Sequence, residues 1–213
     1  MVLSRLLRLL LVLLALGAWT TIGINFRATA GYVTDGANQT YCLGTSDTYP
    51  QPRGGATFGY TSVNGDASRD RSTGVDVRLA GQNQQPNDGT QSVWKLDLTT
   101  SGPKTICLAL GDENSTQGYQ YIQVLDDTTV LFTITDTDGT ANDKFDDANG
   151  TEWSGSAWPG SNTCRTVTFA TTTLVFKLGA TSSQSGSSTI AHLSVTDAGG
   201  SSSGSAANLH EDY

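Results

Sequence analysis

Basic residues are scarce in this sequence, and their scarcity excludes one class of partner. Of 213 residues, 12 are Lys or Arg and 20 are Asp or Glu, so the formal net charge is -8. An acidic surface repels a phosphate backbone, which excludes nucleic acid as the partner.

Cysteine and histidine are also few. The three cysteines have no metal-site spacing, which speaks against zinc. The two histidines lie in an alternating run and in the tail, so a serine hydrolase is not expected.

Apolar residues at helical spacing are almost absent beyond the leader, and 24 glycines with many Ser, Thr, Asn and Asp residues supply turns. Short apolar or alternating runs recur instead, and each predicts a strand. Asp126-Asp127-Thr128 is expected to be a hairpin turn, and the last two runs before residue 180 are expected to pair. About ten strands in this rhythm predict an all-β fold, a two-sheet antiparallel sandwich and most simply a jelly roll. The predicted strands after the first are residues 57–63, 92–98, 104–111, 119–126, 129–135, 164–170, 172–179 and 189–196.

The first residues are typical of a secretion signal. Arg5 and Arg8 precede an uncharged apolar run over residues 9–18, which ends in small residues. This arrangement predicts a signal peptide over residues 1–18. The alternative is an uncleaved anchor, because no charge follows before residue 27 and a membrane span needs about 17–25 residues. Either way, the protein is expected to be secreted or on the extracellular surface, and it contacts a membrane only if the leader is retained.

The mature chain is expected to form one domain over residues 22–197. Its first strand begins at Ile22, and alternate residues on one side continue to Tyr32. Residues 198–213 are rich in Ser and Gly and predict a flexible tail.

Export permits a disulfide, and three cysteines leave one thiol over. Cys107 and Cys164 both lie in predicted strands and are the expected pair, whereas Cys42 lies in a loop and competes for either partner. The alternative is three buried, unpaired thiols.

Two long connections, residues 64–91 and 136–162, interrupt the strand pattern, and connections of this length are usually functional loops or lids. The first contains Arg69, Asp70 and Arg71. A guanidinium group pairs bidentately with a carboxylate, so one arginine is expected to tie the loop to an aspartate of the sandwich. The alternative is that these three residues contact a sugar or an acidic ligand.

The second connection contains Trp153 and Trp158 in polar surroundings. Sugar rings stack their apolar faces on aromatic side chains, so both are candidate ligand contacts. The alternative is that both rings fold back over the open end of the sandwich.

The same connection is rich in carboxylates. Asp136, Asp138 and Asn142 are the candidate ligands of a structural calcium ion, since a hard cation requires oxygen ligands. No other cofactor is expected. The alternatives are solvated turn residues or, least favoured, a catalytic carboxylate pair.

Several short motifs recur in a fixed order along the chain. They are Gly54-Gly55, Phe58-Gly59-Tyr60, Arg69-Asp70-Arg71, Trp94-Lys95-Leu96-Asp97-Leu98 and Gly102-Pro103-Lys104-Thr105-Ile106-Cys107-Leu108-Ala109-Leu110-Gly111-Asp112. Together they resemble the galactose-binding-like carbohydrate-binding module at the front of rhamnogalacturonan acetylesterase-type enzymes. The resemblance implies a non-catalytic jelly roll over about residues 26–179, and it assigns no sugar-contacting residue.

From these features we expect an exported recognition module without enzymatic activity. It would bind a glycan or polysaccharide through loops at one end of the sandwich. The alternative is a structural subunit of a surface, filament or virion that associates with copies of itself.

Overall fold

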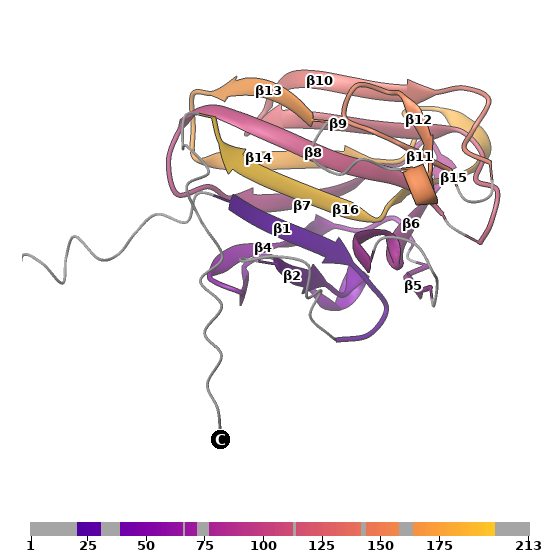
Figure 1. Ribbon diagram of the computed structural model, residues 1–213, viewed down its shortest axis with the longest axis horizontal. Helices are drawn as coiled ribbons and strands as arrows, with labels where there is room; N and C mark the ends of the chain where they lie inside the picture. The colour runs from indigo at the N-terminus through magenta and orange to yellow at the C-terminus, as the bar shows by residue number, and fades with distance from the viewer. Residues whose placement is uncertain are drawn as a thin grey trace, which may run out of the picture.

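The computed structural model describes residues 21–30, 39–65, 67–71, 77–112, 114–141, 144–157 and 164–198 (Figure 1). The predicted leader, Tyr32, Asn142, Trp158 and the tail from residue 199 lie outside these ranges. In the part of the chain that is described, no helix has the length and apolar character that crossing a membrane requires.

Three sheets contain the strands. Sheet A has the order β12 (Glu152–Ser154), β11 (Lys144–Asp146), β8 (Gly102–Asp112), β16 (His192–Asp197), β1 (Thr21–Phe26) and β2 (Gln39–Cys42), with β13 (Cys164–Phe169) also paired to β8. Sheet B has the order β10 (Thr129–Asp136), β9 (Gln120–Asp126), β14 (Thr173–Leu178), β7 (Ser92–Asp97), β4 (Ala56–Ser62) and β3 (Gln51–Arg53). A small sheet joins β15 (Ser183–Ile190), β6 (Gly81–Asp88) and β5 (Arg69–Asp70). The short 3-10 turns are η1 (Gly44–Ser46), η2 (Val77–Leu79) and η3 (Gly155–Ala157).

The strand pairing is nested. β1 pairs with β16, β7 with β14, β8 with β13 and β9 with β10, all antiparallel. One long hairpin rolled up on itself gives this pattern, in which early strands pair with late ones and the innermost pair is consecutive. Figure 1 shows sheets A and B as two stacked layers. The fold is therefore the predicted all-β antiparallel sandwich of jelly-roll type.

The core lies between sheets A and B, and an aromatic cluster forms its centre. Trp94 of β7 is fully buried and stacks on Phe176 of β14, with 4.8 Å between ring centroids. Phe58 stacks on the same indole at 5.6 Å, and Phe26 of β1 meets it edge-on at 5.7 Å. The period-two pattern places these rings on the inner faces of both sheets, so the alternation seen in the sequence is the cause of the layered fold.

The first long connection is not a loop throughout, which corrects the sequence-based prediction. It contains β5, η2 and the eight-residue strand β6. The β6 sequence is polar, yet Gln82, Asn83, Gln85 and Asn87 are all buried. Their amides bond across the fold: the Asn87 Oδ1 atom, for example, accepts from the Ser188 hydroxyl at 2.8 Å and from the Ala180 N–H at 2.9 Å. This strand is stabilised by a buried amide network instead of apolar burial.

Two other strand predictions are wrong. β1 ends at Phe26, and Ala28 and Ala30 are exposed, because the chain turns where Asp70 accepts hydrogen bonds from Arg27 and from the Ala28 N–H. The runs at residues 164–170 and 172–179 do not pair with each other. β13 joins sheet A and β14 joins sheet B.

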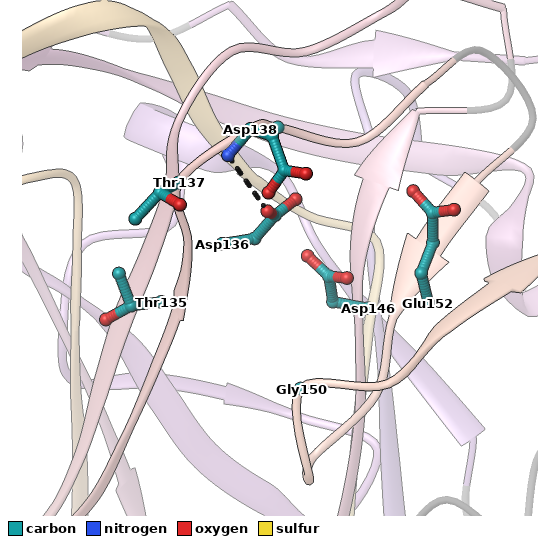
Figure 2. A pocket seen from close by; sticks show the side chains of 8 residues that line it. Thr135, Asp136, Thr137, Asp138, Asp146, Gly150 and Glu152 are labelled. Carbon is teal, nitrogen blue, oxygen red and sulfur yellow. Dashed lines mark hydrogen bonds between the residues drawn. The ribbon is translucent and has the colours of Figure 1, made fainter.

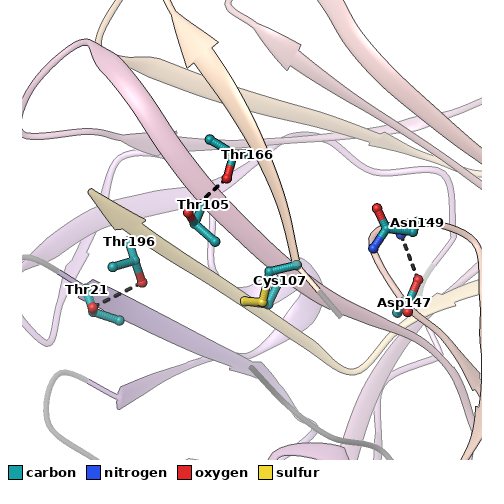
Figure 3. Close-up of a disulfide and its surroundings, with 8 residues drawn as sticks. Thr21, Thr105, Cys107, Asp147, Asn149, Thr166 and Thr196 are labelled. Atoms are coloured by element: carbon teal, nitrogen blue, oxygen red, sulfur yellow. Dashed lines mark hydrogen bonds between the residues drawn. A yellow bond between two sulfur atoms is a disulfide. The ribbon is translucent and has the colours of Figure 1, made fainter. Parts of the chain in front are cut away.

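The disulfide lies on sheet A (Figure 3). Cys107 and Cys164 are directly opposite each other on β8 and β13 and are joined by an S–S bond. Cys42 is buried with a free thiol. Burial is the main reason why the pKa of this thiol is raised well above its ordinary value.

Candidate functional site

A pocket of about 290 Å³ opens where the edge strand β10 of sheet B approaches β11 and β12 of sheet A. Figure 2 shows its side chains, with Asp136 and Asp138 on one side and Asp146 and Glu152 on the other. Every lining residue is acidic, a threonine or a glycine, so the pocket fits a polar ligand or a cation and not an apolar molecule. The lining residues are Thr135, Asp136, Thr137, Asp138, Gly139, Asp146, Gly150 and Glu152.

The β11–β12 hairpin positions one wall of the pocket, and Asp147 builds its turn. The Asp147 carboxylate accepts from the N–H of Asn149 at 2.7 Å, from the N–H of Thr151 at 3.0 Å and from the Trp153 indole N–H at 2.8 Å. With the turn fixed in this way, Asp146 and Glu152 are directly opposite residues of the two strands. Opposite residues of an antiparallel pair project to the same face, so two carboxylates lie side by side there.

Asp146 has an unusual environment. It is 2% exposed, and its Oδ2 atom has no hydrogen-bond partner within the described residues. Burial raises the pKa of Asp146 to about 7, with further contributions from the charges of Asp136 and Glu152. Lys144 compensates only at the rim, because its Nζ atom is 3.7 Å from Glu152 and both side chains are more than a third exposed. The pocket thus contains a buried carboxylate, and the Lys144–Glu152 pair beside it is exposed to solvent.

The opposite wall is the end of β10 and the residues that follow it. The Asp138 N–H donates to the Asp136 carboxylate at 3.2 Å, which folds the chain back at this point. Burial and the nearby Asp138 carboxylate raise the pKa of Asp136. Two of the three predicted calcium ligands therefore do line one pocket, while Asn142 lies outside the described residues.

The predicted arginine loop lies elsewhere and is engaged internally. Arg71 forms a bidentate ion pair with Asp112, whose side chain is fully buried. Asp70 pairs with Arg27, with 3.2 Å between Nε and Oδ1. Arg69 is exposed and donates to the backbone carbonyl of Ser68 at 3.0 Å. Arg71 is thus the loop staple that the sequence favoured, and sugar contacts by Arg69, Asp70 and Arg71 stay a prediction.

Trp153 is half-buried. Its ring packs against a small apolar cluster on sheet A that includes Leu79 and Phe145, and its indole N–H is bonded to Asp147. The ring thus stabilises the hairpin that forms the pocket wall. Trp158 lies outside the described residues.

A pair of half-exposed aromatic rings lies at the start of β9, the strand next to β10. Tyr119 and Tyr121 stack at 6.3 Å between centroids with 11° between ring planes. Tyr121 lies on β9 directly opposite Thr135, a pocket-lining residue of β10. The aromatic pair therefore lies one strand away from a residue that lines the pocket.

Comparison with known proteins gives no family assignment. No family model matches the sequence, and no curated protein matches it. Among solved structures, protein YxiM from Bacillus subtilis is 14% identical with a TM-score of 0.48, over 83% of this chain and 40% of that one. This chain therefore spans about two fifths of that protein's length.

Two carbohydrate-binding modules are also similar in fold. The CBM36-1 domain of a multidomain xylanase from the hindgut metagenome of Trinervitermes trinervoides is 13% identical with a TM-score of 0.38, over 68% of this chain and 98% of that domain. The C-terminal CBM6 of LamC, a marine laminarinase from Zobellia galactanivorans, is 18% identical with a TM-score of 0.38, over 65% of this chain and 93% of that module. With so few positions identical, no residue of this chain inherits a role from these proteins.

Proposed function

We propose that this chain is an exported, non-catalytic recognition module that binds a glycan at the acidic pocket and the adjoining tyrosine surface. The observation that carries the proposal is the composition of the pocket, which is lined by carboxylates, threonine hydroxyls and glycines alone. Carboxylates accept hydrogen bonds and hydroxyls both donate and accept, which matches the hydroxyl groups of a sugar ring.

The tyrosine pair supplies the second element of sugar recognition. Sugar rings present apolar C–H faces, and half-exposed parallel rings offer a surface on which such faces stack. Because Tyr121 lies opposite Thr135, a saccharide that extends from the pocket across β10 reaches this surface. The pocket volume of about 290 Å³ is at the lower end of ligand sites, which fits one sugar unit with the rest of the chain outside.

Export and the lack of catalysis belong to the same proposal. The Cys107–Cys164 disulfide supports an oxidising compartment. Self-association stays a prediction, and within the described residues Val63 and Val130 are the only large apolar side chains that are exposed.

The test is a glycan and polysaccharide panel followed by calorimetric titration of each positive. Thr137→Ala and Tyr121→Ala are expected to weaken binding by about 5- to 30-fold, since each removes a contact worth about 1–2 kcal/mol. Thr129→Ala is the matched control for Thr137→Ala, because Thr129 is an exposed threonine at the far end of β10, the strand that Thr137 directly follows. The proposal is overturned if no glycan of the panel binds, or if Thr137→Ala and Thr129→Ala weaken glycan binding equally.

A further inference from the structure

We propose that the floor of the acidic pocket is a site for one divalent hard cation, with Ca²⁺ as the best fit, bound by Asp136, Asp138, Asp146 and Glu152. The ion would lie in the pocket where we propose that a glycan binds, but the inference concerns the ion alone and does not rest on glycan binding. It adds Asp146 and Glu152 to the residues that the sequence indicated.

The environment of Asp146 is the main evidence for the ion site. An ionised carboxylate buried without a partner is costly, and proteins normally pair such a group or bind a cation to it. The Asp146 Oδ2 atom is buried and unpartnered within the described residues, and the side chain lines the pocket (Figure 2). Its directly opposite neighbour on β12 is Glu152, a second carboxylate, and like charges in that position repel.

The adjacent Asp147 shows that this is not simply a turn rich in solvated acids. Asp147 is equally buried, but three N–H donors satisfy its carboxylate. Asp146, one residue earlier, points into the pocket, and its Oδ2 atom has no hydrogen-bond partner within the described residues. The hairpin therefore uses one aspartate to build the turn and leaves the other free to bind an ion.

The donor set identifies the class of ion. All charged donors among the described lining residues are carboxylates, and none of these residues is a histidine or cysteine, which favours a hard cation over zinc or copper. Ca²⁺ accepts six to eight oxygen ligands in flexible geometry, which the carboxylates, threonine hydroxyls and backbone carbonyls of the two walls can supply. As placed, the described side chains do not already form a group of three that holds a metal. Ion binding is therefore expected to draw the two walls together.

Calorimetric titration of the chelator-treated full chain with CaCl₂ alone tests the site. Ca²⁺ is expected to bind with a Kd of about 10⁻⁴–10⁻³ M, the range of extracellular modules, and to raise the melting temperature. Asp146→Asn is expected to weaken this binding by more than about 10-fold, the loss that even an outer-sphere partner causes. Without Ca²⁺ the same variant is expected to melt at a higher temperature than wild type, because it removes a buried unpaired charge.

Two further variants keep the outcome clear. Glu152→Gln changes an exposed side chain and removes only its exposed ion pair with Lys144, so it tests the site even if Asp146→Asn misfolds. Asp127→Asn is the matched control, since Asp127 is an exposed acid in the β9–β10 turn, away from the pocket. No binding at about 10 mM Ca²⁺, well above the expected Kd range, overturns the inference. Equal affinity of wild type, Asp146→Asn and Glu152→Gln overturns it as well. If Ca²⁺ binds and no glycan of the panel does, the ion site is supported and only the glycan proposal is overturned.

Discussion

Replacing Arg71 with alanine is expected to destabilise the domain far more than the same change at Arg69, two residues earlier. The Arg71 guanidinium forms a bidentate pair with Asp112, and the Nε–Oδ1 distance is 2.8 Å. The Asp112 side chain is fully buried, whereas the Arg71 side chain is 19% exposed. The arginine joins the residues after β5 to the last residue of β8, a central strand of sheet A.

The expected magnitude follows from the groups that remain. Removing one partner of a buried ion pair typically costs about 3–5 kcal/mol, because the other charge stays buried. Asp112 would still accept from the Gln82 side-chain amide at 2.8 Å, from the Gln117 amide at 3.1 Å and from the Asn114 N–H at 2.9 Å. These neutral donors place the loss at the lower end, about 3 kcal/mol.

Urea unfolding followed by tryptophan fluorescence measures the effect. For an m value of about 2 kcal/mol/M, the midpoint of Arg71→Ala is expected to fall by about 1.5 M. Arg69 is exposed and bonds only the neighbouring Ser68 carbonyl, so Arg69→Ala is expected to change the free energy of unfolding by less than about 0.5 kcal/mol. An unchanged midpoint for Arg71→Ala, together with weaker glycan binding, would refute the staple and favour a ligand contact.

Two further predictions concern stability. Cys164→Ser removes a disulfide that spans 57 residues, and loop entropy gives a loss of roughly 4 kcal/mol, seen as a melting temperature lower by about 10 °C. An unchanged melting temperature would contradict this estimate. In the wild-type protein, a thiol assay should find Cys42 unreactive until the protein unfolds. Burial raises the pKa of Asp126, but hydrogen bonds from Thr171 and the Ala170 N–H outweigh burial and lower it below its ordinary value. The carboxylate therefore contributes stability above about pH 4 that is lost as pH falls through its lowered pKa, and Asp126→Asn should flatten the acid limb of a stability–pH curve. Parallel curves for wild type and variant would show that Asp126 does not contribute.

Strands that contain alternating apolar residues were predicted from the sequence. Strands that are stabilised by polar hydrogen bonds were not. β7 to β10 were predicted to within a few residues because Trp94, Leu108, Val124 and Ile134 face one core. β6 was missed because its buried amides look like loop residues until their partners on other strands are known. The β13–β14 pairing was wrong for a related reason. Asp126 accepts from the N–H groups of Ala170 and Thr171, which carries the chain from one sheet to the other at this turn.

The acidic pocket was only half predictable. The crowding of carboxylates over residues 136–152 was visible, and Asp136 and Asp138 were named from it. The different environments of Asp146 and Asp147 were not, because they depend on the register of the β11–β12 hairpin. A short alternation around Phe145 is the only local sign of that strand, and three residues are too few to predict it.

The pairing of β1 with β16 has a consequence for how the domain faces its surroundings. Thr21 lies opposite Thr196, so the chain enters and leaves the sandwich side by side, near the Lys104 end of β8. Asp146 lies beside Leu110, at the other end of that strand. The two flanks of the domain and the acidic pocket therefore lie at opposite ends of β8.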